Sequence, residues 1–258
     1  MPELARDPKE RFSDRVDDYI KYRPHYSPDV VEALRRVCGL TPAHVVVDVG
    51  CGTGLLSEIL LENGNRVIGV EPNPEMGQAG EQYLSRFPRF RLISGSAENT
   101  SLPDTSADFV VAGQAFHWFR PEPTRVEFAR ILKPHGWVVL IWHDRDTEST
   151  PFLRAYEDFL LRHSIDYRQV AHKTVASFEV LRQFYAPNTV HFVSQHTCQQ
   201  FDCDGLRGRL LSSSYAPREG PAAGTMLREL PELFGRYADE GQVAFEYETK
   251  IYYGRLTS

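Results

Sequence analysis

Short apolar runs and amphipathic segments alternate along the first half of the chain. Val45–Val47 is a run of β-branched residues, and the apolar residues from Leu55 to Leu61 recur at helical spacing. A continuous apolar run is typical of a strand that is buried on both faces of a parallel sheet, and helical spacing is typical of a helix with one buried face. The alternation continues to Trp142. It predicts an α/β protein with a mostly parallel, doubly wound sheet.

The predicted elements follow one another at regular spacing up to His143. The predicted strands are Val45–Val47, Arg66–Glu71, Arg89–Ile93, Asp108–Ala112 and Trp137–Trp142. The predicted helices are Asp7–Tyr26, Asp29–Val37, Leu55–Leu61, Pro74–Arg86 and Pro121–Leu132. Since crossovers between parallel strands are right-handed, the carboxyl ends of these strands and the turns after them should lie along one edge.

The pattern changes after His143. Thr150–Tyr185 is mainly helical in character, and the segments Asp204–Ser213 and Pro221–Asp239 also favour helices. Thr189–Thr197 favours a strand, and Val243–Tyr253 alternates apolar and polar residues at period two, which is typical of a strand.

The turn after the first strand carries the candidate ligand chemistry. Asp48 ends the strand, and Gly50, Gly52 and Gly54 form a G-x-G-x-G turn before a helix. Glycines allow a sharp turn and the close approach of a ligand, and the free N–H groups of a helix start favour an anionic group. A dinucleotide fingerprint would place its third glycine at Leu55, and a P-loop would need a lysine here. Glu71, at the end of the next strand, suits both hydroxyls of a ribose, so a nucleoside is favoured.

Several motifs resemble those of the class I S-adenosylmethionine-dependent methyltransferases. Val46–Gly54 (VVDVGCGTG), Glu71 and Gly95–Glu98 (GSAE) resemble the cofactor motifs of this family. Asp108–Phe119 (DFVVAGQAFHWF) and Tyr19–Pro28 (YIKYRPHYSP) resemble its small-molecule branch, the methyltransferase type 11 or trans-aconitate methyltransferase-like proteins. The match is dense from about Arg11 to His143 and thinner afterwards.

The resemblance implies a particular sheet and domain organisation. Its sheet would have seven strands in the order 3-2-1-4-5-7-6, with strand 7 antiparallel. Residues 1–40 would form N-terminal lid helices, and residues 41–258 the methyltransferase domain. Helical insertions would occupy about 145–187, after strand 5, and 204–240, after strand 6.

The resemblance also implies a set of site residues around S-adenosylmethionine as cofactor. The expected cofactor-binding residues are Asp48, Gly50, Cys51, Gly52, Gly54, Glu71, Met76, Ser96, Ala97, Glu98 and Gln114. The expected lid and substrate residues are Tyr19, Tyr22, Arg23 and Trp118. Asp48 would hold the methionyl end, although it can also cap the turn through its carboxylate.

Two residues near the expected methyl position each have two interpretations. His117 follows the fourth strand, where it is either a general base or a residue that makes a structural hydrogen bond. Arg145 either pairs with a substrate carboxylate or lies at the surface beside Asp144 and Asp146, and the surface interpretation is the simpler one.

Composition and charge exclude several classes of partner. The 258 residues have a net charge of −6, so no electrostatic footprint for nucleic acid is expected. The opening MPELARDPKERF lacks the apolar core of a signal peptide, and the longest apolar run, Trp137–Trp142, is too short to span a membrane. We therefore expect a cytoplasmic protein without a membrane partner. No histidine or cysteine spacing indicates a metal site, and none is expected.

The sequence thus predicts a methyltransferase that acts on a small-molecule acceptor by in-line displacement. A non-catalytic protein that binds S-adenosylmethionine or S-adenosylhomocysteine is an alternative, and a dinucleotide-dependent oxidoreductase is disfavoured by the glycine spacing. These patterns leave the acceptor, the atom that is methylated and the oligomeric state open.

Overall fold

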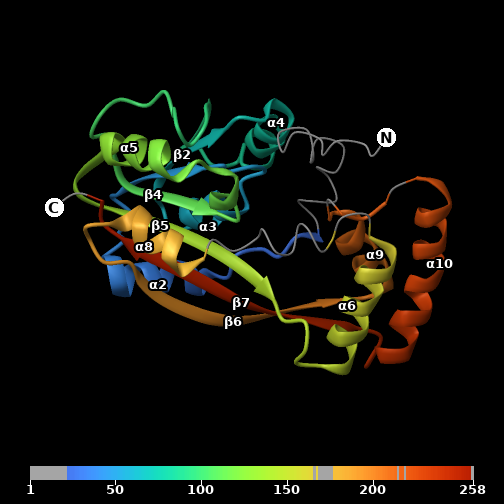
Figure 1. Cartoon of the computed structure of the whole chain (residues 1–258). Coiled ribbons are helices and arrows are strands. Elements are labelled where there is room, and N and C mark those ends of the chain that lie inside the picture. Colours follow the sequence, from blue (N-terminus) through green and yellow to red (C-terminus); the bar gives the residue numbers. More distant parts are fainter. Residues whose placement is uncertain (1–21, 165–166, 168–176, 214, 218, 257–258) are drawn as a thin grey trace, which may run out of the picture.

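The fold is built around one seven-stranded sheet in the order β3-β2-β1-β4-β5-β7-β6 (Figure 1). The computed structural model describes residues 22–164, 167, 177–213, 215–217 and 219–256. The strands are β1 (Val45–Val49), β2 (Arg66–Glu71), β3 (Phe90–Ser94), β4 (Ala107–Gly113), β5 (Leu132–Arg145), β6 (His191–Phe201) and β7 (Val243–Gly254). β7 runs antiparallel to β5 and β6, and the other pairs are parallel. The predicted sheet order and the antiparallel strand 7 are confirmed.

Helices cover both faces of this sheet and form three layers with it. The described helices are α2 (Pro28–Cys38), α3 (Leu55–Glu62), α4 (Pro74–Tyr83), α5 (Pro121–Ile131), α6 (Pro151–His163), α8 (Phe178–Tyr185), α9 (Cys203–Leu211) and α10 (Gly220–Tyr237). In β1, Val47 and Val49 pack with α5 and α8, whereas Val46 packs with α2 and α3. Because both faces of β1 are covered, the strand is apolar throughout up to Asp48.

The three helices α6, α9 and α10 form a separate packed group at one end of the molecule (Figure 1). Their buried residues meet the first half of β7 at Val243, Phe245 and Tyr247. The segments that follow β5 and β6 therefore converge beyond the carboxyl end of β5. Among the described helices, none has the length and apolar character that crossing a bilayer requires.

Strand β5 is longer than its apolar core predicted. The prediction covered Trp137–Trp142, whereas the strand runs from Leu132 to Arg145. Its first residue pairs with Ala107 of β4, and its last residue pairs with Tyr247 of β7. Backbone pairing thus extends the strand through polar residues that an apolar pattern cannot mark.

The predicted N-terminal helix ends earlier than expected. Tyr22 is helical, but residues 23–27 are not, so the prediction of a helix up to Tyr26 is wrong over its last residues. Proline disfavours the helical conformation in the residue before it, and Pro24 follows Arg23 directly. Residues 1–21 lie outside the described part of the chain, and Tyr19 is among them.

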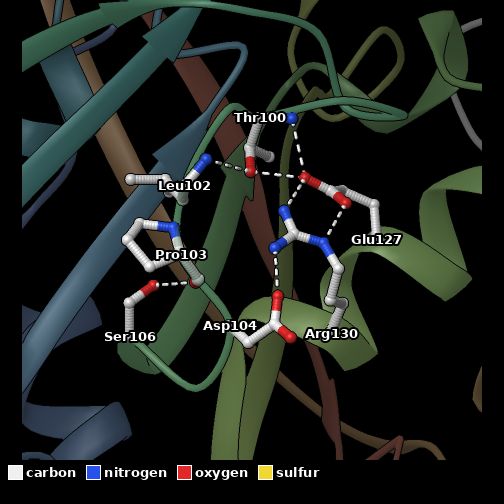
Figure 2. A network of polar contacts seen from close by, with 7 residues as sticks. All are labelled: Thr100, Leu102, Pro103, Asp104, Ser106, Glu127 and Arg130. Carbon is white, nitrogen blue, oxygen red and sulfur yellow. Dashed lines mark hydrogen bonds and ion pairs between the residues drawn. The ribbon is translucent and has the colours of Figure 1, made fainter.

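A polar network fixes the long loop between β3 and β4 to helix α5 (Figure 2). The buried Glu127 carboxylate accepts hydrogen bonds from Thr100 N at 2.7 Å and from Thr100 Oγ1 at 2.5 Å. Arg130 donates to Glu127 from Nε and Nη2, and to Asp104 from Nη1 at 2.6 Å. A carboxylate that lies among several donors is well solvated by the protein, so this loop has a defined path from the end of β3.

Candidate active site

A cavity of about 720 Å³ opens at the carboxyl edge of the sheet. Its walls come from the ends of β1, β2, β4 and β5, from the loops after them, and from α6 and α9. Small-molecule sites typically measure roughly 300–1,000 Å³. The predicted site residues on its wall are Arg23, Asp48, Gly50, Cys51, Gly52, Glu71, Met76, Ser96, Ala97, Glu98, Gln114, His117 and Trp118.

Two other predicted site residues are described but lie away from the cavity wall. Gly54 precedes α3 with φ +86°, and a Cβ there would collide with Leu84, so this glycine is required by packing. The Tyr22 ring packs against Gly208 of α9, at a position where a Cβ would overlap it. Both residues serve contacts between elements.

The turn after β1 depends on left-handed glycines. Gly50 and Gly52 have φ values of +68° and +54°, and Gly50 N donates to Val70 O at 2.8 Å. A Cβ at Gly50 would lie 2.7 Å from Ala115 Cβ, whereas a Cβ at Gly52 would meet only the end of Met76 at 3.4 Å. The need for glycine at position 52 is therefore conformational, and the backbone there faces the cavity.

Glu71 connects the end of β2 to this turn. Its Oε2 accepts from Gly52 N and its Oε1 accepts from Asn73 N, each at 2.9 Å. Burial raises the pKa of the Glu71 carboxyl above its ordinary value, and the two hydrogen bonds act against that rise. A carboxylate offers about four acceptor positions, so Glu71 can still accept from a ligand.

Asp48 is a buried carboxyl group with one oxygen left for a ligand. It exposes 1% of its surface, and its Oδ2 accepts from Ser57 Oγ at 2.7 Å. Its Oδ1 is buried and has no hydrogen-bond partner. Burial raises the pKa of Asp48 to about 7, and the negative charge of Glu71 adds to the rise. A cationic ligand group beside Oδ1 would favour the ionised form of this carboxyl group.

Met76 and the loop after β3 close the cavity on this side. Met76 is buried near the start of α4, and Ala97 is buried in the loop. Glu98 Oε1 accepts from Arg120 N at 3.0 Å. Burial acts to raise the pKa of Glu98, but this hydrogen bond and further ones outweigh it, so the pKa lies below its ordinary value. Glu98 is thus an ionised residue that is tied to the start of α5.

The loop after β4 is held by Gln114 and carries His117. Gln114 has φ +56°, and its Nε2 donates to His143 O at 2.9 Å. His117 lies in a short 3₁₀ helix, Phe116–Trp118, and its Nδ1 is buried without a hydrogen-bond partner. Burial lowers the pKa of His117 to about 4. The imidazole is therefore neutral at pH 7, while the adjacent Trp118 is 39% exposed.

His143 is a cavity residue that the sequence analysis did not single out. Its Nδ1 lies 2.7 Å from Thr249 Oγ1, its ring lies 4.3 Å from the Tyr26 ring, and its Nε2 has no partner. Burial lowers the pKa of His143 to about 4. One signal was available, because His143 directly follows the apolar run Trp137–Trp142, and the ends of parallel strands carry functional residues.

Besides Arg23, the arginines Arg145 and Arg209 line the cavity, and Arg145 corrects an expectation. Arg145 exposes only 10% of its side chain and donates from Nη2 to Glu157, so its assignment to the surface beside Asp144 and Asp146 is wrong. Arg209, from α9, exposes 6%. No motif marks Arg209 in the sequence, because α9 reaches the cavity only through tertiary packing.

The cavity therefore has two sides with opposite charge. The glycine side, at the ends of β1 to β3, consists of Asp48, Gly52, Glu71, Met76 and Ala97. The arginine side, at the end of β5 and under α6 and α9, consists of Arg145, Glu157, Tyr167, Arg209 and Tyr215. The loop with Gln114 and His117 lies between them, because β4 separates β1 from β5.

The chain is similar in sequence to known methyltransferases. Residues 47–140 match a family that is described as a methyltransferase domain. An uncharacterized methyltransferase of Mycobacterium tuberculosis is 37% identical over 141 residues, which cover 55% of each chain. A second one, from Schizosaccharomyces pombe, is 33% identical over 150 residues, which cover 58% of each chain. The matches span just over half the length of these curated relatives.

Solved structures show the same fold over most of the chain. A protein of Anaeromyxobacter dehalogenans, described as a type II methyltransferase, has a TM-score of 0.60 at 21% identity and covers 92% of this chain and 99% of its own. A protein of Anabaena variabilis, described as a methyltransferase from an antibiotic biosynthesis pathway, also has a TM-score of 0.60, at 23% identity, with 90% and 98% covered. At these identities the likeness concerns the fold.

Proposed function

Because the chain belongs to the class I S-adenosylmethionine-dependent methyltransferases, we propose that it transfers a methyl group from S-adenosylmethionine to a small-molecule acceptor. One observation carries this proposal: a single cavity of about 720 Å³ joins the glycine side to the arginine side. A site for the donor alone would not need the second side. The volume suits a cofactor together with a small acceptor rather than a macromolecular surface.

The residues of the glycine side fit the proposed cofactor. The Asp48 Oδ1 atom is buried without a partner, and an ammonium group is the kind of donor that would satisfy it. Glu71 has acceptor positions left for the two ribose hydroxyls. The backbone at Gly52 faces the cavity without a side chain, so a ligand can approach it closely.

The reaction asks mainly for binding and orientation. S-adenosylmethionine supplies an activated methyl group whose transfer leaves a neutral thioether. The chain must then hold the acceptor in line and keep water out, which buried side chains around the cavity do. His117 and His143 are neutral at pH 7, so either ring can donate to or accept from the acceptor without adding charge near the methyl group.

The proposal can be tested with the methyl group followed directly. The purified protein is incubated with methyl-labelled S-adenosylmethionine and a cell extract that has been separated by dialysis into small molecules and macromolecules. We expect label in a new product of the small-molecule fraction, and none with the Glu71→Ala variant. Transfer to the macromolecular fraction alone would contradict the small-molecule acceptor.

Two alternatives give different outcomes in a binding experiment. Calorimetry with S-adenosylmethionine, S-adenosylhomocysteine and NAD separates a methyltransferase from an oxidoreductase, because we expect binding of the first two only. A non-catalytic binding protein would bind both sulfur compounds and transfer no label. The arginine side disfavours the non-catalytic alternative, because a protein that only binds the cofactor does not need a second polar wall in the cavity.

A further inference from the structure

The strongest unexplained feature of the molecule is the pair of arginines on the arginine side of the cavity. Arg145 donates from Nη2 to Glu157 Oε2 at 2.5 Å and to Tyr167 OH at 2.9 Å. Its guanidinium also lies 5.2 Å from the centre of the Tyr156 ring. The second terminal nitrogen, Nη1, is buried and has no hydrogen-bond partner. Arg145 is therefore held in place through Nη2, while Nη1 remains available to donate to a ligand.

Arg209 is the more unusual of the two because it has no acidic partner in the described part of the chain. It exposes 6% of its surface, and it donates from Nε to Tyr247 OH at 3.3 Å and from Nη1 to Ser213 Oγ at 3.0 Å. Both acceptors are neutral hydroxyl groups. Among the described residues, no carboxylate forms a salt bridge with Arg209. Burying a charge without a counter-charge is strongly unfavourable, so a residue of this kind indicates a missing anion.

Among the described residues, Glu157 offsets the charge of Arg145, and no nearby carboxylate is left to offset the charge of Arg209. Glu157 is engaged by Arg145 and Tyr167, and Asp144 forms an ion pair with Lys250 at 2.8 Å. The excess positive charge of the arginine side affects the phenol group of Tyr215. Burial acts to raise the pKa of this phenol. The positive charges of Arg209 and Arg145, a hydrogen bond with Ser213 and the charge of Arg23 together outweigh burial, so the pKa lies below its ordinary value.

The arginine side is placed to meet the acceptor rather than the cofactor. It lies at the end of β5, and the strands β1 and β4 separate it from Glu71 at the end of β2. Arg209 and Tyr215 come from the segment after β6, which is far in sequence from the glycine turn. A ligand that spans the cavity would thus present one end to each side.

We propose that Arg145 and Arg209 form a subsite that binds a carboxylate group of the methyl acceptor. This inference rests on the proposed function, and it narrows the acceptor to small organic acids. Arginine matches a carboxylate through its planar fork, and a buried charge-assisted pair of this kind is both strong and directional. The bound carboxylate is then the anionic partner that Arg209 lacks among the described residues.

The carboxylate in this subsite is an anchor and does not itself receive the methyl group. An oxygen that accepts hydrogen bonds from two guanidinium groups has lost much of its nucleophilicity, so the methylated atom belongs to another part of the acceptor. A carboxylate also suits the site better than a phosphate dianion, because Glu157 lies against Arg145 and would repel the second charge.

The test measures binding of acids to the protein saturated with S-adenosylhomocysteine. A panel of small mono- and dicarboxylic acids is titrated by calorimetry, each with its neutral amide and with inorganic phosphate as a third ligand. We expect at least one acid to bind about tenfold or more tightly than its amide and more tightly than phosphate. If every amide matches its acid, or if phosphate binds best, the inference is overturned.

The variants assign the effect to the two arginines. Arg209→Gln should weaken binding of the selected acid at least about tenfold and leave its amide unaffected. Arg209→Lys keeps the positive charge but lacks the planar guanidinium fork. Its affinity for the selected acid should therefore lie between those of Arg209→Gln and the wild type. Arg182→Gln, at an exposed arginine of α8, is the matched control and should change nothing. Equal acid affinity in Arg209→Gln and the wild type would refute the subsite.

A separate titration keeps the two proposals distinct. S-adenosylhomocysteine is first titrated alone into the wild type and each variant, and its unchanged affinity shows that the variants are folded. If the wild type does not bind it, the proposed function fails. If the wild type binds it and the acids show no preference for Arg209, only the subsite fails.

Discussion

The glycine side and the arginine side of the cavity are built in different ways. On the glycine side the main chain does most of the work, because Gly52 N and Asn73 N hold Glu71 and the turn exposes backbone to the ligand. On the arginine side, long side chains from β5 and α9 reach inward and are held by hydroxyl groups and by Glu157. A backbone site fixes one ligand, whereas a wall of side chains can change by single substitutions. The difference fits the proposal that the glycine side binds the methyl donor and the arginine side binds the acceptor.

The difference also makes the two sides separable. One carries the carboxyl groups of Asp48 and Glu71, and the other carries Arg145 and Arg209. A substitution on one side should therefore change the affinity for one ligand and leave the other ligand alone. Single substitutions on each side, and between the two sides, test that separation.

The largest effect should come from Glu71→Ala. The substitution removes two possible charge-assisted hydrogen bonds to the ribose, each worth about 1.5–3 kcal/mol, and it also releases Gly52 N and Asn73 N. We expect the affinity for S-adenosylhomocysteine to fall by about 100-fold or more in calorimetry. Glu81→Ala, at an exposed position of α4, is the control. Unchanged affinity with an intact fold would remove Glu71 from the cofactor site.

The next effect concerns Asp48 and is read from its pH dependence. Burial raises the pKa of Asp48 to about 7 from 3.8, so folding favours the protonated form. The stability of the protein without ligand should then fall as the pH rises through 7, while Asp48→Asn should lack this loss. Cofactor affinity should run the other way, weakening as the pH falls below 7, by at most about tenfold per pH unit.

Chemical unfolding and calorimetry at about pH 5.5, 7 and 8.5 measure both trends for Asp48. In the variant, the free energy of unfolding should be higher than in the wild type at the highest pH, and the affinity about tenfold lower. A wild-type affinity that is constant over this range would show that Asp48 does not meet a cationic group of the cofactor.

The contrast between the two sides also explains which site residues the sequence predicted. The glycine side lies within one strand–turn–helix–strand unit, so residues 46–71 contain its main motif as adjacent letters, and the ends of β3 and β4 follow from the parallel order. The spacing of residues in one short segment is enough to predict a site when the backbone of that segment forms the site. Gly54 belongs to the same motif, but packing against Leu84 explains it.

The residues of the arginine side do not belong to a local sequence motif of this kind. Arg145 looked like a surface residue because acids flank it, and only the pairing of β5 with β7 and the packing of α6 bury it. Arg209 lies in a helix whose neighbours are set by the docking of α6, α9 and α10. A side chain that reaches a site through tertiary packing leaves no periodic pattern, so spacing does not reveal it.

A smaller effect is expected for Gly52→Ala. The residue has φ +54°, where alanine costs about 1–2 kcal/mol, but a Cβ there would meet only Met76 Cε, at 3.4 Å. Stability should therefore fall by about that amount, and the affinity for S-adenosylhomocysteine should fall by roughly tenfold because the methyl group lies where the ligand approaches. Binding of the selected acid should stay the same. If the acid and the cofactor weaken together, the two sides are coupled through the turn.

The smallest effect should come from His117, which lies between the two sides. Burial lowers the pKa of its imidazole to about 4, so the ring is neutral throughout the range from about pH 5.5 to 8.5 and is a weak base there. Replacement of a general base typically lowers turnover by about 10²–10⁴-fold, whereas loss of one positioning hydrogen bond costs about tenfold or less. We expect the smaller loss for His117→Gln, since glutamine can still donate and accept.

Single-turnover rates across pH with an identified acceptor decide between the two roles of His117. A positioning role gives parallel pH profiles for the wild type and His117→Gln, and His143→Gln serves as the comparison, because its imidazole has the same lowered pKa and lies at the end of β5. Reduced stability with both binding and turnover degraded would instead indicate that His117 only packs the loop. A wild-type rate that rises with a single ionisation, lost in His117→Gln together with a drop of about 100-fold or more, would make His117 the base. It would also mean that the bound ligands raise the pKa of this buried imidazole above the value that burial alone sets.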